Sequence, residues 1–180
     1  MRLIVPGRSK STLVSKAVQL KDLPREGSAV EVRENERYKG VFATEDIRSG
    51  SVIFHLRGTV STRPTKYTIQ LGEERHLESP PIRRASDKLD YCWKYLNHSC
   101  APNGYINAAE LIFLALRDIA MGEEITFNYL STETEMDAPF NCRCGSANCF
   151  GFIQGRNFLD QDQIDRLPLA VGASPRSSAR

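Results

Sequence analysis

Residues 95–103 read YLNHSCAPN, and this stretch is the most informative part of the sequence. It places an amide, an imidazole and a thiol close together, on Asn97, His98 and Cys100. Three interpretations are open from these residues alone: a Cys–His nucleophilic pair, part of a metal site, or a polar loop bonded to the backbone. A nucleophilic pair also needs an orienting group and an oxyanion hole, and the sequence has no signal for either. The rest of the chain must decide among these interpretations.

The overall composition is that of a globular protein. The chain has 180 residues, of which 41% are hydrophobic and 26% are charged, and its formal net charge is +2. This length suits one domain with short tails, and so small a net charge does not favour nucleic acid as a direct ligand. No apolar run approaches the roughly 20 residues that a membrane-spanning helix needs, and Pro6 interrupts the short apolar start. Neither membrane insertion nor secretion is therefore expected.

The cysteines point to metal binding. An odd number of them without a secretory signal argues against a disulfide scaffold, and it favours a reducing compartment inside the cell, cytoplasm or nucleus. Cys142, Cys144 and Cys149 form a C-x-C-x4-C pattern that can supply three corners of a tetrahedral Zn²⁺ site. A segment so poor in aliphatic residues also needs something other than a core to fold it. The fourth ligand stays open among Cys92, Cys100 and His98.

Hydrophobic periodicity favours a single, mostly β domain with few helices. Residues 72–87 are charged and contain prolines, which is typical of a loop. The cysteine-rich segment would form a C-terminal flap, and the end of the chain has the composition of a disordered tail. The pattern predicts strands at 28–33, within 40–56 on both sides of a turn at Ser49-Gly50, at 66–71, 111–117 and 123–130, and helices at 87–96 and 160–167.

Three motifs, in this order, resemble the SET-domain protein lysine methyltransferases that carry a post-SET zinc segment. They are YLNHSCAPN, then GEEITFNY at 122–129, then CRCGSANCFGF at 142–152, and the resemblance covers about residues 30–153. It implies a SET fold, in which small curved β-sheets surround a threaded, knot-like core and a zinc-bound flap follows. The implied division is a basic N-terminal arm (1–27), the SET domain (28–135), the post-SET flap (136–156) and a partly disordered C-terminal tail (157–180).

The same resemblance implies a reaction and its residues. S-adenosylmethionine would give its methyl group to the side-chain amine of a lysine in a protein substrate, a histone or another basic protein. Tyr129 would lie beside the transferring methyl, with Tyr67 and Phe127 near it. A structural zinc ion would be held by Cys100, Cys142, Cys144 and Cys149. The implied cofactor contacts are Lys39, Gly40, Val41, Phe42, Tyr67, Lys94, Asn97, His98, Phe150 and Phe152.

Two positions depart from the family pattern. Tyr38 stands in place of the first glycine of a Gly-x-Gly opening, so that only Gly40 matches. Lys94 stands where many members have an arginine, and a lysine cannot form a bidentate fork with a carboxylate. The cofactor contacts at these two positions are therefore expected to differ from those of the family.

Two further features concern the substrate. Phe127 is expected on the same strand and face as Tyr129, and in this family a phenylalanine here leaves room for di- or trimethylation. Glu133, Glu135 and Asp137 lie between Tyr129 and the cysteine motif, with no basic residue among them. This acidic segment would attract a basic peptide, or it is simply a solvated loop.

Two rival functions remain. The first is a degenerate SET-type module that binds a protein or the cofactor without turnover, which the presence of Asn97, His98 and Tyr129 argues against. The second is a zinc-stabilised nucleic-acid binder that uses the basic N-terminal arm, and the net charge of only +2 argues against it.

Overall fold

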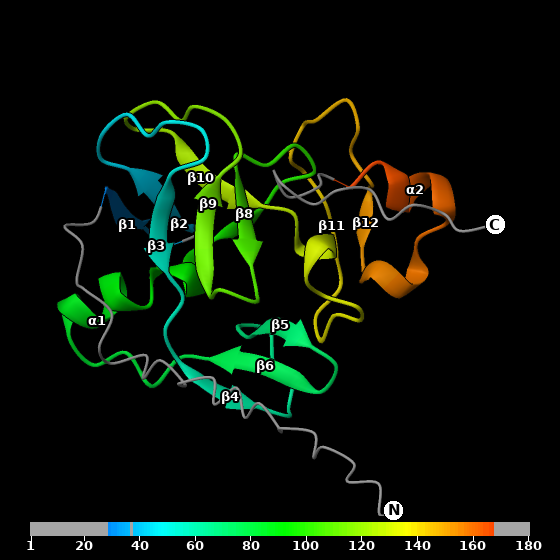
Figure 1. Cartoon of the computed structure of the whole chain (residues 1–180), viewed down its shortest axis with the longest axis horizontal. Helices are drawn as coiled ribbons and strands as arrows, with labels where there is room; N and C mark the ends of the chain where they lie inside the picture. Colours follow the sequence, from blue (N-terminus) through cyan, green and yellow to red (C-terminus); the bar gives the residue numbers. More distant parts are fainter. Residues whose placement is uncertain (1–28, 37, 168–180) are drawn as a thin grey trace, which may run out of the picture.

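Short strands dominate the structure, a computed structural model of the chain that describes residues 29–36 and 38–167 (Figure 1). The helical elements are all one or two turns long, and in the described part of the chain none could cross a bilayer. The prediction of a mostly β fold with short helices is thus confirmed. The strands are β1 (Val30–Glu34), β2 (Lys39–Ala43), β3 (Val52–His55), β4 (Thr59–Ser61), β5 (Ile69–Gly72), β6 (Arg75–Glu78), β7 (Asn97–His98), β8 (Gly104–Asn107), β9 (Ile112–Ala115), β10 (Glu124–Phe127), β11 (Phe140–Asn141) and β12 (Phe152–Ile153). The helices are α1 (Ala85–Asp90), α2 (Gln161–Asp165) and the 3₁₀ turns η2 (Cys92–Tyr95), η3 (Tyr129–Ser131) and η4 (Arg156–Phe158).

The strands form several small sheets rather than one large one. A four-stranded sheet has the order β1-β2-β10-β7, two three-stranded sheets have the orders β3-β9-β8 and β4-β6-β5, and β11 pairs with β12. In Figure 1 the β4-β6-β5 sheet lies below the others, and β11 and β12 lie on the right next to α2.

The pairing of β7 with β10 brings two distant motifs together. The two strands run parallel, with Asn97 opposite Thr126 and His98 opposite Phe127. The backbone of Ser99 continues the contact by donating a hydrogen bond to the carbonyl oxygen of Phe127 at 3.0 Å. Because β10 pairs with β2 on its other side, it lies in the middle of the sheet and holds residues 97–99 in a fixed register.

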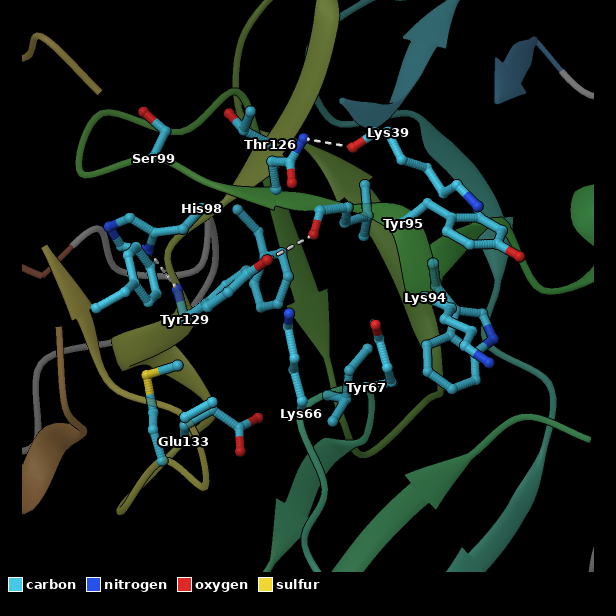
Figure 2. Close-up of a pocket in the computed structure, with 18 of the residues that line it drawn as sticks. Lys39, Lys66, Tyr67, Lys94, Tyr95, His98, Ser99, Thr126, Tyr129 and Glu133 are labelled. Atoms are coloured by element: carbon cyan, nitrogen blue, oxygen red, sulfur yellow. Dashed lines mark hydrogen bonds between the residues drawn. The ribbon is translucent and has the colours of Figure 1, made fainter. Parts of the chain in front are cut away.

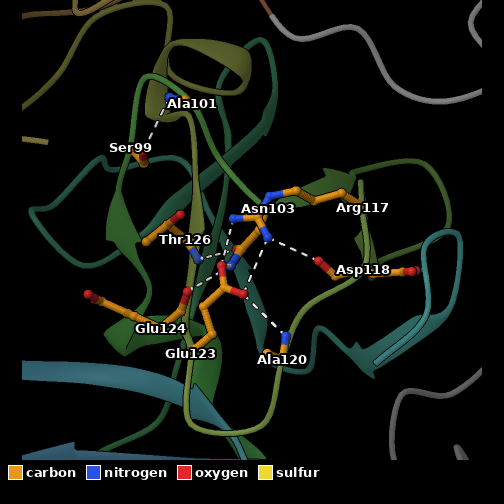
Figure 3. A network of polar contacts seen from close by, with 9 residues as sticks. All are labelled: Ser99, Ala101, Asn103, Arg117, Asp118, Ala120, Glu123, Glu124 and Thr126. Carbon is orange, nitrogen blue, oxygen red and sulfur yellow. Dashed lines mark hydrogen bonds and ion pairs between the residues drawn. The ribbon is translucent and has the colours of Figure 1, made fainter. Parts of the chain in front are cut away.

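A buried asparagine fixes the loop after β7 to the start of β10 (Figure 3). Asn103, with 2% of its surface exposed, donates to the carbonyl oxygen of Glu124 at 2.7 Å and to Oε1 of Glu123 at 3.0 Å. Its own Oδ1 accepts from the backbone N–H of Thr126 at 2.9 Å. Displacing a buried amide with these bonds costs free energy, because its partners would be left unsatisfied. Asn103 therefore stabilises the crossing of the two motifs.

The interior consists of two hydrophobic clusters of unequal size. The larger one lies between the sheets and contains the fully buried side chains of Trp93, Phe113 and Ile125. The smaller one has only four buried members, which are Cys100, Leu130, Ile153 and Leu167. Partly buried residues around the smaller cluster include the three cysteines of the C-x-C-x4-C motif. Such a small core is unlike that of a stable domain, so the flap needs another source of stability.

Two sequence predictions about the middle of the chain were wrong. Residues 72–87 were expected to be a loop, but β6 lies there and pairs with both β4 and β5. Only His76 and Leu77 of β6 are buried, so charged residues at both ends hide the strand pattern. The helix expected at 87–96 is broken at Tyr91, whose backbone angles of −123° and 34° leave the helical region. Residues before the break form α1 and those after it form η2.

The last predicted strand also ends earlier than expected. The strand predicted at 123–130 ends at Phe127, and Tyr129 begins η3 after Asn128 caps the turn by accepting from the N–H of Leu130 at 3.0 Å. Phe127 and Tyr129 therefore do not share one strand, which corrects the prediction that they do. Other predictions hold, including β1, β2, β3, β9 and the short helix α2. The basic arm at 1–27 and the end of the C-terminal tail lie outside the described residues.

Candidate active site

A cavity of about 1230 Å³ lies where η2, β7, β10 and η3 meet the segment leading to the cysteine motif. Ligand pockets commonly enclose about 300–1,000 Å³, so this cavity has room for a small molecule together with a long side chain. Figure 2 shows several of its lining residues. Those that were predicted from the sequence and that line the cavity are Lys39, Tyr67, Lys94, Asn97, His98, Phe127, Tyr129, Cys142 and Cys144.

Tyr129 is held at both its hydroxyl and its backbone. The hydroxyl donates to the carbonyl oxygen of Leu96 at 2.7 Å, and the backbone N–H donates to Nδ1 of His98 at 3.1 Å (Figure 2). Burial, followed by the charges of Glu133 and Glu124, raises the pKa of the Tyr129 phenol. The phenol is therefore neutral at physiological pH and can orient a ligand through hydrogen bonds, but it is a poor base.

Asn97 turns the nitrogen of its side-chain amide toward β2. Nδ2 donates to the carbonyl oxygen of Lys39 at 2.9 Å and to Oε1 of Glu124 at 2.7 Å, and it lies 3.3 Å from the hydroxyl of Tyr38. No residue in the described ranges donates to Oδ1, so this oxygen can accept a hydrogen bond from a ligand in the cavity. The contacts of Nδ2 fix which way the amide points.

Tyr38 occupies the place of the missing glycine without blocking this arrangement. Burial and its hydrogen bond to Glu124 raise the pKa of Tyr38 to about 12. A Cβ atom at Gly40 would lie only 2.8 Å from the Tyr38 hydroxyl oxygen and 2.9 Å from Oε1 of Glu124. Gly40 is thus needed because a side chain there would displace the groups that orient Asn97.

His98 connects Tyr129 to the cysteine motif. Burial lowers the pKa of His98 to about 4, so its imidazole is neutral at physiological pH. Nδ1 accepts from the backbone of Tyr129, so the ring proton belongs on Nε2, which lies 3.2 Å from Sγ of Cys100. Both ring nitrogens thus have protein partners, and a cofactor contact from His98 would come from its main chain or its ring face.

Four cysteines converge beside the cavity. The sulfur atoms of Cys100, Cys142, Cys144 and Cys149 all lie within 4.8 Å of one another, and Cys100 lies 3.8 Å from Cys142 and 3.9 Å from Cys149. A tetrahedral zinc ion with Zn–S bonds of about 2.3 Å places its ligands about 3.8 Å apart, so the donor set fits zinc. Cys92 is not part of the group and is buried in the larger hydrophobic cluster.

The cysteine group also argues against a Cys–His nucleophile. Sγ of Cys100 lies among the sulfur atoms of three other cysteines, whereas a Cys–His nucleophile needs a thiolate that is free to attack a substrate. Backbone N–H groups of Phe150, Cys144 and Gly151 each point at a cysteine sulfur, at 3.4 Å. Such contacts are typical of the surroundings of metal-bound sulfur.

Three lysines and two tyrosines are among the residues that line the cavity, namely Lys39, Lys66, Lys94, Tyr67 and Tyr95. Tyr67 is 55% exposed, and Nζ of Lys94 lies 5.3 Å from the centre of its ring. Lys39 pairs with Glu34 at 2.6 Å and lies 4.7 Å from the ring centre of Tyr95. Because Glu34 offsets the charge of Lys39, the positive charge that can attract a carboxylate comes from Lys66 and Lys94, although no guanidinium fork is present at position 94.

Five predicted cofactor residues do not line the cavity. Val41 is fully buried in the larger cluster, Phe150 packs against the cysteine group, and Phe152 is 49% exposed on β12. Gly40 and Phe42 also lie outside the lining. Contacts from these residues to a cofactor stay predictions, and at Val41 they would have to come from the main chain.

Other lining residues were not selected from the sequence. Tyr95 and Glu124 lie next to predicted residues, so their position beside the motifs was the available signal. Met136 and Phe140 reach the cavity from the irregular segment before the cysteine motif, where no periodicity exists to indicate a direction. Their part in the site depends on how the flap folds back.

Residues 39–130, more than half of the chain, match the family model of the SET domain. The chain therefore belongs to the SET-domain family, as its motifs indicated. The cysteine group fits the post-SET zinc segment of that resemblance.

The sequences of curated relatives match parts of this chain. The methyltransferase flvH of Aspergillus flavus is 40% identical over 74 residues, which cover 40% of this chain and 42% of the relative. The histone-lysine N-methyltransferase, H3 lysine-36 specific, of Chaetomium globosum is 27% identical over 154 residues, which cover 78% of this chain and 17% of the relative. The chain thus spans less than half the length of these relatives.

Solved structures support the fold. The crystal structure of KRYPTONITE in complex with mCHG DNA and SAH is similar with a TM-score of 0.53 at 20% identity, and the match covers 68% of this chain and 28% of that one. A second KRYPTONITE structure, with mCHH DNA, an H3(1-15) peptide and SAH, is similar with a TM-score of 0.52 at 20% identity. At such identity the likeness concerns the fold alone.

Proposed function

We propose that the protein transfers the methyl group of S-adenosylmethionine to the side-chain amine of a lysine in a protein or peptide. The observation that carries this proposal is the meeting of Asn97, Phe127 and Tyr129 at one cavity of a SET-domain chain. The names of the relatives support it, since they include methyltransferases of histone lysine. The SAH in the KRYPTONITE structures agrees with the cofactor.

The residues of the cavity suit this reaction. S-adenosylmethionine supplies a methyl group on a positively charged sulfur, so the transfer depends mainly on aligning donor and acceptor. Asn97 Oδ1 would accept a hydrogen bond from the cofactor's ammonium group, and Lys94 would attract its carboxylate as a single charge. Tyr129 has oxygen lone pairs left beside its bond to Leu96, and these would orient the incoming amine.

Zinc would have a structural role in this protein. Cys100 follows the cofactor residues directly, whereas the other three cysteines belong to the flap. A zinc ion bound by all four would fix the flap beside the cavity, and the small hydrophobic cluster there would otherwise hold it weakly. The chemistry itself needs no metal at this position.

The substrate is proposed to present its lysine among basic residues. Glu135 and Asp137 are exposed on the segment between η3 and β11, where they would attract a positively charged peptide. Histones fit this description, as do other basic proteins in the nucleus or cytoplasm. We propose no nucleic acid or membrane as a direct ligand. Phe127 would leave space for di- or trimethylated products.

Labelled cofactor tests the proposal. The purified protein is incubated with methyl-labelled S-adenosylmethionine, core histones and an array of lysine peptides, and Tyr129→Phe is the control. We expect labelled lysine from the wild type and a loss of roughly 100-fold or more in the variant, because the hydroxyl that positions the amine is gone. Binding of the cofactor product, measured by calorimetry, should be equal in both. A wild type that binds cofactor but methylates no lysine would instead identify a binding module without turnover.

A further inference from the structure

Glu133 is a half-buried carboxylate on the wall of the same cavity, one turn after Tyr129. Oε1 accepts from the backbone N–H of Gln70 at 2.8 Å and from the hydroxyl of Thr132 at 3.0 Å. No residue that the structure describes donates to Oε2 or forms an ion pair with this carboxylate. Figure 2 shows the group directed toward Lys66 and Tyr67, below the Tyr129 ring. Oε1 is thus hydrogen-bonded to the protein, and Oε2 can accept a hydrogen bond from a ligand.

The backbone around Glu133 is held on both sides, so the carboxylate has a defined position. Its N–H donates to the carbonyl oxygen of Tyr129 at 2.8 Å, and its carbonyl accepts from Arg156 N–H at 2.9 Å. Gly155 makes this second approach possible, since a Cβ there would lie 2.4 Å from the carbonyl oxygen of Thr134. A catalytic group needs this kind of support to act at a fixed distance from its substrate.

No ion pair with a described residue compensates the charge of Glu133, although Lys66 lines the same cavity. Burial raises the pKa of Glu133, against the lowering effect of its hydrogen bonds from Gln70 and Thr132, because burial disfavours the charged form. The Arg156 guanidinium does not pair with Glu133, because it donates to the carbonyl oxygens of Leu130 and Ser131. The titratable side chains that line the same cavity include Lys66 and Tyr67 from the loop before β5, Glu124 from β10, Tyr129 from η3, and Asp137 from its own segment. A partly buried carboxylate that lines a cavity and has no ion pair among the described residues is a candidate for function.

Resting on the proposed function, we propose that Glu133 is a catalytic residue that receives the ammonium of the substrate lysine and takes its proton. In this step Oε2 forms a bond to the proton, and the N–H bond electrons stay on the lysine nitrogen as its lone pair. That lone pair then attacks the cofactor's methyl carbon, and the bonding pair of the sulfur–carbon bond leaves on sulfur. The lysine enters as a cation, gives its proton to Glu133, and becomes a cation again on methylation.

The proposed methyl transfer requires a group that deprotonates the substrate lysine. A free lysine amine has a pKa near 10.4, so almost all of it is protonated at physiological pH and cannot attack. The Tyr129 hydroxyl is a poor acceptor for that proton, since it is neutral and already donates to Leu96. Glu133 combines negative charge with an available oxygen on the same wall, so it can both attract the cation and deprotonate it.

A purely structural role is the alternative, because Glu133 also links η3 to the edge strand β5. Gln70 makes the other half of this link, accepting through Oε1 from the N–H of Thr134 at 2.8 Å and from its hydroxyl at 2.9 Å. Glu133→Gln keeps a carbonyl oxygen for the N–H of Gln70 and removes the charge. Gln70→Ala keeps the charge and weakens the link. Glu110→Gln, in the exposed turn between β8 and β9, controls for the loss of one surface charge.

The experiment measures kcat and the KM for peptide against pH in these variants, with calorimetry to follow cofactor binding. We expect Glu133→Gln to fold and bind cofactor normally, to lose roughly 100-fold in kcat near pH 7.5 and to recover as the pH rises toward 10, where free lysine loses its own proton. The KM should rise as well, whereas Glu110→Gln should match the wild type.

If Glu133→Gln has the kcat and the pH dependence of the wild type, the inference is overturned and the proposed function stands. The result is clearest if Gln70→Ala has lost activity in the same assay. A wild-type protein that methylates no lysine at any pH would overturn both.

Discussion

At the residue scale, Phe127 packs against Tyr129, beside which the proposed methyl acceptor would lie. Its side chain is 4% exposed, and its ring centre lies 4.8 Å from that of Tyr129 and 6.4 Å from that of Phe113. The contact with Tyr129 is close although the two residues belong to different elements. A polar atom added to the Phe127 ring would therefore change the volume and the hydrogen bonding beside Tyr129.

Phe127→Tyr should shift the products toward monomethyllysine. The added hydroxyl takes up space beside the methyl acceptor and needs a hydrogen-bond partner when buried, which a bound water can supply. Mass spectrometry over a time course should show the first methylation near its wild-type rate and the second slowed by roughly 10-fold or more, equivalent to about 1.4 kcal/mol. Thermal unfolding checks that overpacking has not damaged the fold. Unchanged product ratios, or a wild type that stops at one methyl group, would contradict the role given to Phe127.

At the candidate site, the sequence predicted residues that the structure brings together at one cavity, but not the contacts that hold them. Asn97, His98, Tyr129 and the four cysteines are rare residue types in a fixed order, and such order can be read directly. Their partners come from other elements, so Leu96, Tyr38 and Glu124 were not predicted as the groups that hold them. Tyr38 was noted only as a departure, because a hydrogen bond between residues far apart in the chain has no periodic signal.

At the element scale, β10 depends on a polar network as well as on its sheet neighbours. Glu123, next to the start of β10, accepts from Arg117 at 2.6 Å, from Asn103 at 3.0 Å and from the backbone of Ala120 at 3.2 Å (Figure 3). The hydrogen bond from Arg117 is the main cause that lowers the pKa of Glu123. The charged carboxylate thus stabilises the turn from which β10 begins.

Glu123→Gln should lower stability at neutral pH but not in acid. A lowered pKa in the folded state means that the carboxylate stabilises the fold above its unfolded pKa, near 4.3, and that this contribution is lost as the pH falls through the folded value. Urea unfolding should show the variant about 1 kcal/mol less stable at pH 7, with the difference shrinking below pH 4. Glu110→Gln should show neither effect. A difference that stays constant from pH 7 to pH 3 would mean that the charge of Glu123 is not responsible.

Elements were predictable where their apolar pattern was strong. β2 and β9 contain runs of buried aliphatic or aromatic residues, β3 is a short apolar run around the buried Ile53, and the sequence located all three. β6 was missed because charged residues at both of its ends hide its pattern, and β7 and β11 were missed because two residues are too few to show alternation. Residues 97–98 form the strand β7 by pairing with β10. Tertiary pairing rather than local preference therefore determines this strand.

At the scale of the whole molecule, two parts of unequal hydrophobic content meet at the candidate active site. The sheets have the larger core, whereas the flap has a small cluster around the cysteines. Phe140 of the flap packs edge-on against His98 and Tyr129, with ring centres 5.7 Å and 6.0 Å apart. Any loosening of the flap therefore reaches Tyr129 through these aromatic contacts.

Cys100→Ser should remove zinc and loosen the flap while leaving the sheets folded. Serine is a poor zinc ligand, and a structural zinc site supplies much of the folding free energy of the segment that it binds. Elemental analysis should fall from one zinc per chain toward none, and hydrogen exchange should increase over residues 140–153 but not in β1, β2 and β10. Activity should fall at least 10-fold as a consequence.

Cys92→Ala is the matched control for this change, because Cys92 is buried among the residues of the larger cluster and lies outside the cysteine group. It should cost stability through the lost packing but keep one zinc per chain and protection of the flap. If both variants keep zinc, Cys100 is not a ligand. If Cys100→Ser loses zinc while the flap stays protected, the aromatic contacts with His98 and Tyr129 are sufficient to hold the flap, and the metal is not what joins the two parts of the molecule.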